Sequence, residues 1–90
     1  MTDTTMWEVR AAEGAMDALV AWVQSEVLAG ALAATPGFSA EVYVAADDRL
    51  VVIATADEGP PRLPDAPAAL VRRPAHQWRF RRLGDSAGGV

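Results

Sequence analysis

One histidine and one tyrosine stand out among the side chains that could do acid–base chemistry. The imidazole of His76 can ligate a haem iron or move a proton, because its charge changes near neutral pH. The phenol of Tyr43 can hydrogen-bond a phenolic substrate. We take both as candidate catalytic residues. Each has a structural alternative, in which His76 only opens a final strand and Tyr43 only packs on a half-buried strand.

Aromatic and cationic side chains supply the candidate substrate-binding residues. Trp22 and Trp78, two of the three tryptophans, can line a pocket for an aromatic substrate, although large aromatics also dominate ordinary cores and interfaces. Arg79, together with Arg81, can hold an anionic ligand. The alternative is that one of these arginines pairs with Glu8 on a neighbouring strand.

Composition excludes several kinds of site. Cysteine is absent, so there is no disulfide, thiolate metal site or cysteine nucleophile. Asp47-Asp48 is too short and isolated for a metal site, and Arg72-Arg73 suits the end of a short helix. We find no phosphate loop and no nucleophile triad. We therefore expect no metal and no cofactor.

Charge and hydropathy restrict the partners. The 12 acidic residues outnumber the 8 basic ones, which argues against general nucleic-acid binding. The N-terminus lacks the pattern of a signal peptide, and no run reaches the roughly 18–20 apolar residues of a membrane helix. We expect a cytoplasmic protein with no nucleic-acid and no membrane partner.

Hydrophobic periodicity predicts the elements that would position these residues. Residues 6–12 alternate as a first strand, after a frayed end at residues 2–5, and residues 14–34 carry the three-and-four spacing of a long amphipathic helix. Further elements are predicted by alternation, turn residues and prolines: strands at 40–45 and 50–56, a short helix capped by Asp65 at 66–73, and a strand at 76–83.

The segment between helix and second strand reads Pro36-Gly37-Phe38. Proline cannot continue the helical hydrogen bonding, glycine permits a positive φ, and Phe38 can fold back under the helix end. The order is then β-α-β-β-α-β, the split βαβ pattern of a ferredoxin-like sandwich with a four-stranded antiparallel sheet and one long and one short helix. We predict a single domain at residues 1–84 and a flexible tail at 85–90.

The chain resembles the antibiotic biosynthesis monooxygenase-like family of dimeric α+β barrels. The resemblance rests on Pro36-Gly37-Phe38, on Glu41-Val42-Tyr43-Val44 and on Leu50-Val51-Val52-Ile53, and it spans about residues 6–83. It implies a monooxygenase-like protein that binds or oxidises a hydrophobic aromatic compound, polyketide-like or haem-like, without metal or added cofactor.

A rival interpretation is a non-catalytic dimeric module of the same fold, either a ligand binder or a structural partner. Two departures from the family pattern favour it: the chain has no Asn, and no Trp follows the third strand. Both interpretations predict a homodimer. The strand at 50–56 is apolar on both faces, yet the two expected helices can cover only one face of the sheet.

Overall fold

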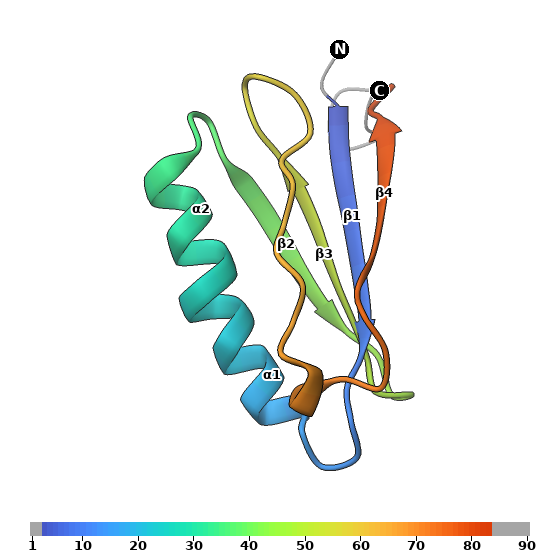
Figure 1. Ribbon diagram of the computed structural model, residues 1–90. Helices are drawn as coiled ribbons and strands as arrows, with labels where there is room; N and C mark the ends of the chain where they lie inside the picture. Colours follow the sequence, from blue (N-terminus) through green and yellow to red (C-terminus); the bar gives the residue numbers. More distant parts are fainter. Residues whose placement is uncertain (1–2, 84–90) are drawn as a thin grey trace.

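The computed structural model describes residues 3–83 as one sheet with one main helix (Figure 1). The strands are β1 (Asp3–Arg10), β2 (Ser39–Val44), β3 (Arg49–Thr55) and β4 (His76–Arg81). The helical segments are α1 (Met16–Trp22), the π-helix η1 (Val23–Leu28), α2 (Ala29–Ala34) and the 3-10 turn η2 (Ala68–Leu70). The strand predicted from residue 6 begins at Asp3, and Asp3 to Thr5 pair with β4 rather than fraying. The predicted tail at 85–90 lies outside the described residues.

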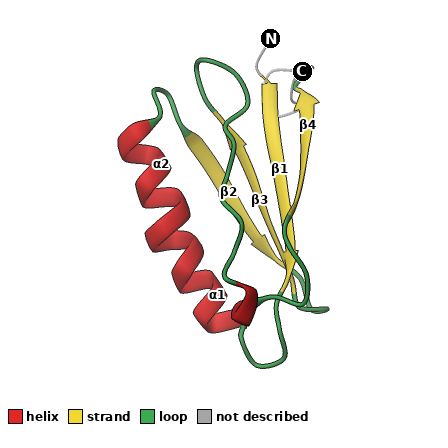
Figure 2. Ribbon diagram, viewed as in Figure 1, coloured by secondary structure: helices red, strands yellow, loops and turns green. Residues whose placement is uncertain are grey.

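The sheet is open and antiparallel throughout, with the strand order β2-β3-β1-β4. The helix and the long segment before β4 both lie on one side of it (Figure 2). This arrangement confirms a small α+β fold with a four-stranded antiparallel sheet and one main helix. It also leaves one face of the sheet uncovered among residues 3–83.

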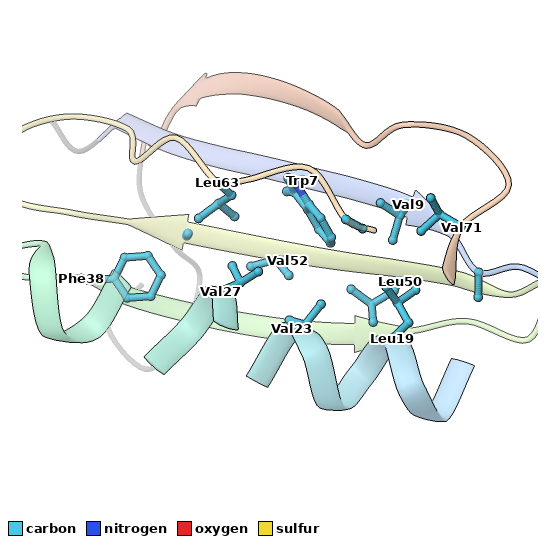
Figure 3. Packing of buried hydrophobic residues seen from close by; sticks show 13 residues of the cluster. Trp7, Val9, Leu19, Val23, Val27, Phe38, Leu50, Val52, Leu63 and Val71 are labelled. Atoms are coloured by element: carbon cyan, nitrogen blue, oxygen red, sulfur yellow. The ribbon is translucent and has the colours of Figure 1, made fainter. Parts of the chain in front are cut away.

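The alternating pattern of the central strands explains which face is covered. Trp7 and Val9 of β1 and Val52 of β3 are fully buried, and Trp7 lies opposite Val52 in the register. Because successive side chains of a strand point to opposite faces, their sequence neighbours point to the uncovered face. The core lies between the helix and the sheet, and Leu63 and Val71 reach into it from the segment before β4 (Figure 3).

The helix buries a strict four-residue repeat, Leu19, Val23 and Val27. On an α-helix such a repeat drifts by about 40° at each step. The π-helical turn η1 has more residues per turn, so it rotates the repeat back toward the sheet.

The helical segment Met16–Ala34 is long and apolar enough to cross a membrane, by length and composition alone. The core helix of a soluble protein passes the same test. The expectation of no membrane partner therefore stays a prediction.

The Pro-Gly-Phe segment ends the helix as the sequence predicts. Gly37 has a φ of 69°, and Phe38 is buried in the core. The turn is also packed against the end of β3, because the Asp57 amide donates to the Pro36 carbonyl at 3.1 Å. The positive φ favours glycine here, and a Cβ on Gly37 would also have to displace the Asp57 carboxylate.

The predicted second helix at 66–73 is wrong, because only the 3-10 turn Ala68–Leu70 forms there and no side chain caps it. Residues 56–75, here called the strap, instead run along the sheet beside the helix (Figure 1). Prolines prevent a regular helix, since they lack the N–H that helical hydrogen bonds need. The strap is held by β1 side chains: Thr5 donates its hydroxyl to the Pro61 carbonyl, and Trp7 donates Nε1–H to the Pro64 carbonyl at 3.1 Å.

Gln77 of β4 holds the strap with two hydrogen bonds to the backbone of one residue. Its Nε2 donates to the Leu63 carbonyl at 2.6 Å, and its Oε1 accepts from the Leu63 amide at 3.1 Å. A side-chain amide here replaces the two backbone hydrogen bonds that a neighbouring strand would provide. The strap therefore takes the place of a second helix without leaving the Leu63 backbone groups unsatisfied.

Candidate functional site

The uncovered face of the sheet carries three of the five candidate site residues. We call it the open face, and it consists of the outward side chains of the four strands. Two of its rows follow from the register: Tyr43, Val51, Glu8 and His76 form one, and Glu41, Ile53, Met6 and Trp78 form the next. Tyr43 and His76 thus share a row but occupy opposite edges of the sheet.

The two candidate catalytic residues do not meet within one chain. The strands β3 and β1 lie between Tyr43 on β2 and His76 on β4. Strands lie about 4.8 Å apart, so the two side chains are separated by roughly 14 Å. That distance excludes a proton transfer between them, which needs hydrogen-bond contact or one bridging water.

The environment of Tyr43 favours a neutral phenol. A hydrogen bond to Glu41 and the negative charge of that carboxylate, with a smaller contribution from desolvation, raise the pKa of Tyr43 above its ordinary value. A phenol with a raised pKa is a weaker proton acceptor at neutral pH because its phenolate is scarcer. Its single O–H donates to Glu41, so towards a ligand the Tyr43 oxygen can accept a hydrogen bond, and Tyr43 is poorly suited to act as a base.

His76 lies opposite Glu8 in the register, but within residues 3–83 no ion pair joins the two, and the ring contact of His76 is with a tryptophan. Its ring meets Trp78 edge to face, with the centroids 5.7 Å apart. Within residues 3–83, no group of three or more His, Cys, Asp or Glu side chains is placed to hold a metal ion. The contact suits packing on an exposed sheet surface.

Trp22 lies on the other side of the sheet from Tyr43, His76 and Trp78. It stacks on Trp7 with a centroid distance of 6.4 Å, at the margin of the core. Trp22 and Trp78 therefore do not line one pocket, because they lie on opposite sides of the sheet. The space between helix and sheet is filled by core side chains (Figure 3), and Trp22 packs against them.

The suggested pairing of Glu8 with Arg79 or Arg81 is wrong. Arg79 and Arg81 alternate with the open-face residues of β4, so they point to the covered side. Glu8 instead accepts from Arg73 Nη2 at 3.0 Å and lies 3.1 Å from Arg49 Nε. The Arg49 contact is an ion pair without a hydrogen bond, since that Nε has no hydrogen-bond acceptor among the described residues.

The Glu8 pairs belong to a network at one end of the sheet. Asp47 lies 3.5 Å from both Arg10 and Arg49, and Arg72 donates to Asp48 at 2.8 Å. The expectation that Arg72-Arg73 only suits a helix end is corrected, because there is no helix end and both arginines tie the strap to the sheet. The acidic pair Asp47-Asp48 is thus an arginine partner. Glu8, with 13% of its side chain exposed, is the least accessible member.

Several concave regions lie away from the centre of the open face, and two of them bear on the candidate residues. A mainly apolar groove of about 380 Å³ runs between the helix and β2, lined by Leu28, Leu32 and Phe38 among others. A smaller cavity of about 140 Å³ lies between the strap and β4, and Arg79 lines it with Arg62. None of the five candidate site residues lines the groove, and Trp78 and Arg79 line the small cavity.

Gln77 is the residue that sequence reasoning missed. The signal that could have found it is an isolated glutamine in an alternating strand that follows a segment too rich in proline to make its own hydrogen bonds. Glu8 is a predicted arginine partner, but its partners are Arg49 and Arg73 and not the arginines of β4.

Comparisons with known proteins add no assignment to this geometry. No protein-family model, no curated protein and no solved structure matches the chain.

Proposed function

We propose that the protein is a homodimeric ferredoxin-like module whose two copies pack open face to open face, and that it is non-catalytic. The order of elements and of strands fits the split βαβ pattern, with the strap in place of the second helix. The observation that carries the proposal is the apolar character of the open face.

Large apolar side chains gather on that face. Trp78 is 43% exposed, and Phe80 and Tyr43 are each 51% exposed. Between them lie the partly buried side chains of Met6, Ile53 and Val51 on the central strands. A contiguous patch of this kind marks an interaction surface in soluble proteins.

A second copy of the chain is the partner that we favour. Glu8 and Asp47, at one end of this face, are neutralised by Arg10, Arg49 and Arg73. Glu41 lies in the row of Ile53 and Met6, where it hydrogen-bonds Tyr43. The rest of the face is mainly apolar and complementary to itself, as a twofold dimer requires. A domain of this size also buries only roughly 60–65% of its unfolded surface alone.

The area of the open face determines how much of it the dimer must use. Four strands about 4.8 Å apart and about 20 Å long give a flat rectangle of roughly 400 Å². Stable dimers bury about 800 Å² per partner. The accessible area of the open face exceeds that of the flat rectangle, because side chains protrude from the sheet. The contact must therefore extend from β2 at one edge to β4 at the other.

Sedimentation equilibrium at micromolar concentration tests the proposal. We expect a mass of twice the 9.5 kDa chain. Phe80→Glu and Tyr43→Glu, at opposite edges of the face, should each give monomers. Leu32→Glu is the matched control, because Leu32 is 68% exposed on the helix and lies off the face. A wild-type mass near 9.5 kDa would refute the dimer.

A second candidate function is monooxygenase-like binding or oxidation of a hydrophobic aromatic compound, and the groove between helix and β2 favours it. Its volume of about 380 Å³ and its apolar lining suit a small ring system. Titration with 1-naphthol, followed by chromatography for oxidised product, tests it. Leu32→Arg should weaken binding at least tenfold and Ala33→Arg should not. Equal affinities of the two variants would reject the groove as the site.

A further inference from the structure

Six of the eight arginines of the chain fall into two groups with different surroundings. Arg10, Arg49, Arg72 and Arg73 pair with carboxylates at one end of the sheet. Arg62 and Arg79 line the cavity of about 140 Å³ between the strap and β4. Of the described residues that line this cavity, none carries a carboxylate. In a chain with 12 acidic residues against 8 basic ones, two cations without an acid in one cavity require an explanation.

We infer that this cavity is a binding site for a small oxyanion, the phosphate or carboxylate group of a ligand, held by Arg62 and Arg79. Guanidinium groups match the geometry of such oxyanions and can form paired charge-assisted hydrogen bonds with them. Within residues 3–83, neither guanidinium group has a hydrogen bond or ion pair that would have to be broken first.

The cavity is built by the attachment of the strap. The two hydrogen bonds between Gln77 and the Leu63 backbone, at 2.6 and 3.1 Å, fix the strap beside β4. Arg62 precedes Leu63, and Arg79 follows Gln77 on the same side of β4. The clamp therefore brings together two arginines that are far apart in the sequence.

The inner part of the cavity is rigid and partly polar. Thr5, which is 4% exposed, lies directly opposite Arg79 in the β1–β4 register and donates its hydroxyl to the Pro61 carbonyl. Pro60 and Pro61 line the strap side. Prolines lose little conformational entropy when a ligand binds, because their backbone is already restricted. The small volume selects an oxyanion group over a large ring system.

This site is independent of the proposed dimer. Arg79 points to the covered side of the sheet and Arg62 belongs to the strap, whereas the dimer uses the open face. Anion binding therefore tests this proposal separately from the dimer, because the cavity is present in a monomer and in a dimer.

Isothermal titration with inorganic phosphate at constant ionic strength tests the site, and malonate in a second series separates phosphate from carboxylate preference. We expect saturable binding of at least one anion, weakened about tenfold or more by Arg62→Gln and by Arg79→Gln, as expected for loss of a charge-assisted hydrogen bond. Arg81→Gln is the matched control, because it lies on the same strand and side and does not line the cavity.

The variants should keep the wild-type thermal unfolding midpoint, since both cavity arginines are exposed. Equal weakening by Arg81→Gln, or the same heat when chloride replaces phosphate and malonate, would show only general charge attraction and would overturn the proposal. Absence of saturation with both anions would overturn it as well.

Discussion

The two faces of the sheet are made by neighbouring residues of the same strands, yet they have different roles. On the covered face, Trp7 is fully buried, stacks on Trp22 and donates a hydrogen bond to the strap. On the open face, Trp78 is 43% exposed and has only an edge contact with His76. The same residue type therefore stabilises the fold on one face and remains available for a partner on the other. The difference comes from what covers each face, not from the strands themselves.

The largest expected effect separates these two tryptophans. Trp7→Ala should cost about 3–5 kcal/mol of unfolding free energy, because it leaves a cavity and an unpaired strap carbonyl. That is a large part of the stability of a small domain, about 5–15 kcal/mol. Trp78→Ala should cost about 1 kcal/mol or less in the monomer. Urea unfolding at a protein concentration low enough to keep both variants monomeric measures the two values. Equal costs would show that the faces do not differ as described.

A smaller loss is expected at the strap. Gln77→Ala removes two hydrogen bonds and leaves the Leu63 amide and carbonyl without their side-chain partner. We expect a loss of about 1–3 kcal/mol and faster amide exchange at Leu63. Gln24→Ala, on the exposed side of the helix, is the control and should change stability by about 0.5 kcal/mol or less. Unchanged exchange at Leu63 in Gln77→Ala would mean that the strap is held by its apolar side chains alone.

Two glycines provide a matched pair with opposite signs. Gly37 has a positive φ, and a Cβ there would have to displace the Asp57 carboxylate, so Gly37→Ala should destabilise the protein by about 1–3 kcal/mol. Gly30 lies in α2 with open space around it, so Gly30→Ala should stabilise by up to about 1 kcal/mol. Thermal unfolding of both variants gives the comparison. A gain in stability for Gly37→Ala would contradict the packed turn.

The smallest effect concerns Tyr43 on the open face. Because Glu41 raises the pKa of Tyr43 above 10.0, the phenol should ionise at higher pH in the folded chain than in urea. A raised folded-state pKa means that the associated stability is present below pH 10.0, the ordinary Tyr value, and lost as the pH rises through the raised value. Absorbance titration of the phenolate follows this ionisation. Glu41→Gln should lower the pKa toward 10.0, and an unchanged titration would remove Glu41 as the cause.

Much of the fold was predictable because it depends on local patterns. Alternation in residues 6–12 and 50–56 predicted which side chains share a face, and the register confirms this for Trp7 and Val9 against Glu8. Proline and glycine predicted the end of the helix, which falls at Ala34. The prediction of a second helix was wrong because the prolines around Asp65 prevent a regular helix, and only the turn Ala68–Leu70 forms. The side chains that hold the strap belong to β1 and β4, so the sequence of the strap itself does not predict these hydrogen bonds.

The candidate site was less predictable, because it depends on which strands are neighbours. Tyr43 and His76 looked compatible in the sequence, but the strand order β2-β3-β1-β4 puts them on opposite edges. Glu8 looked available to Arg79, but the alternation of β4 sends Arg79 to the other face. Ionic partners come from whichever segments the fold brings together, and Arg73 reaches Glu8 from the strap, 65 residues away in the chain.

The sequence by itself determined the positions of the strands and the helix, the break at Pro36-Gly37-Phe38 and the apolar character of both faces of the central strands. These features follow from backbone restrictions and hydrophobic periodicity, which act between residues close in the chain. Only the tertiary structure decided that the strap replaces a second helix, that one face of the sheet stays open, and that Arg62 and Arg79 share a cavity. Each of these depends on contacts between distant segments, whose stability comes from burial and hydrogen bonds formed only when the sheet is assembled.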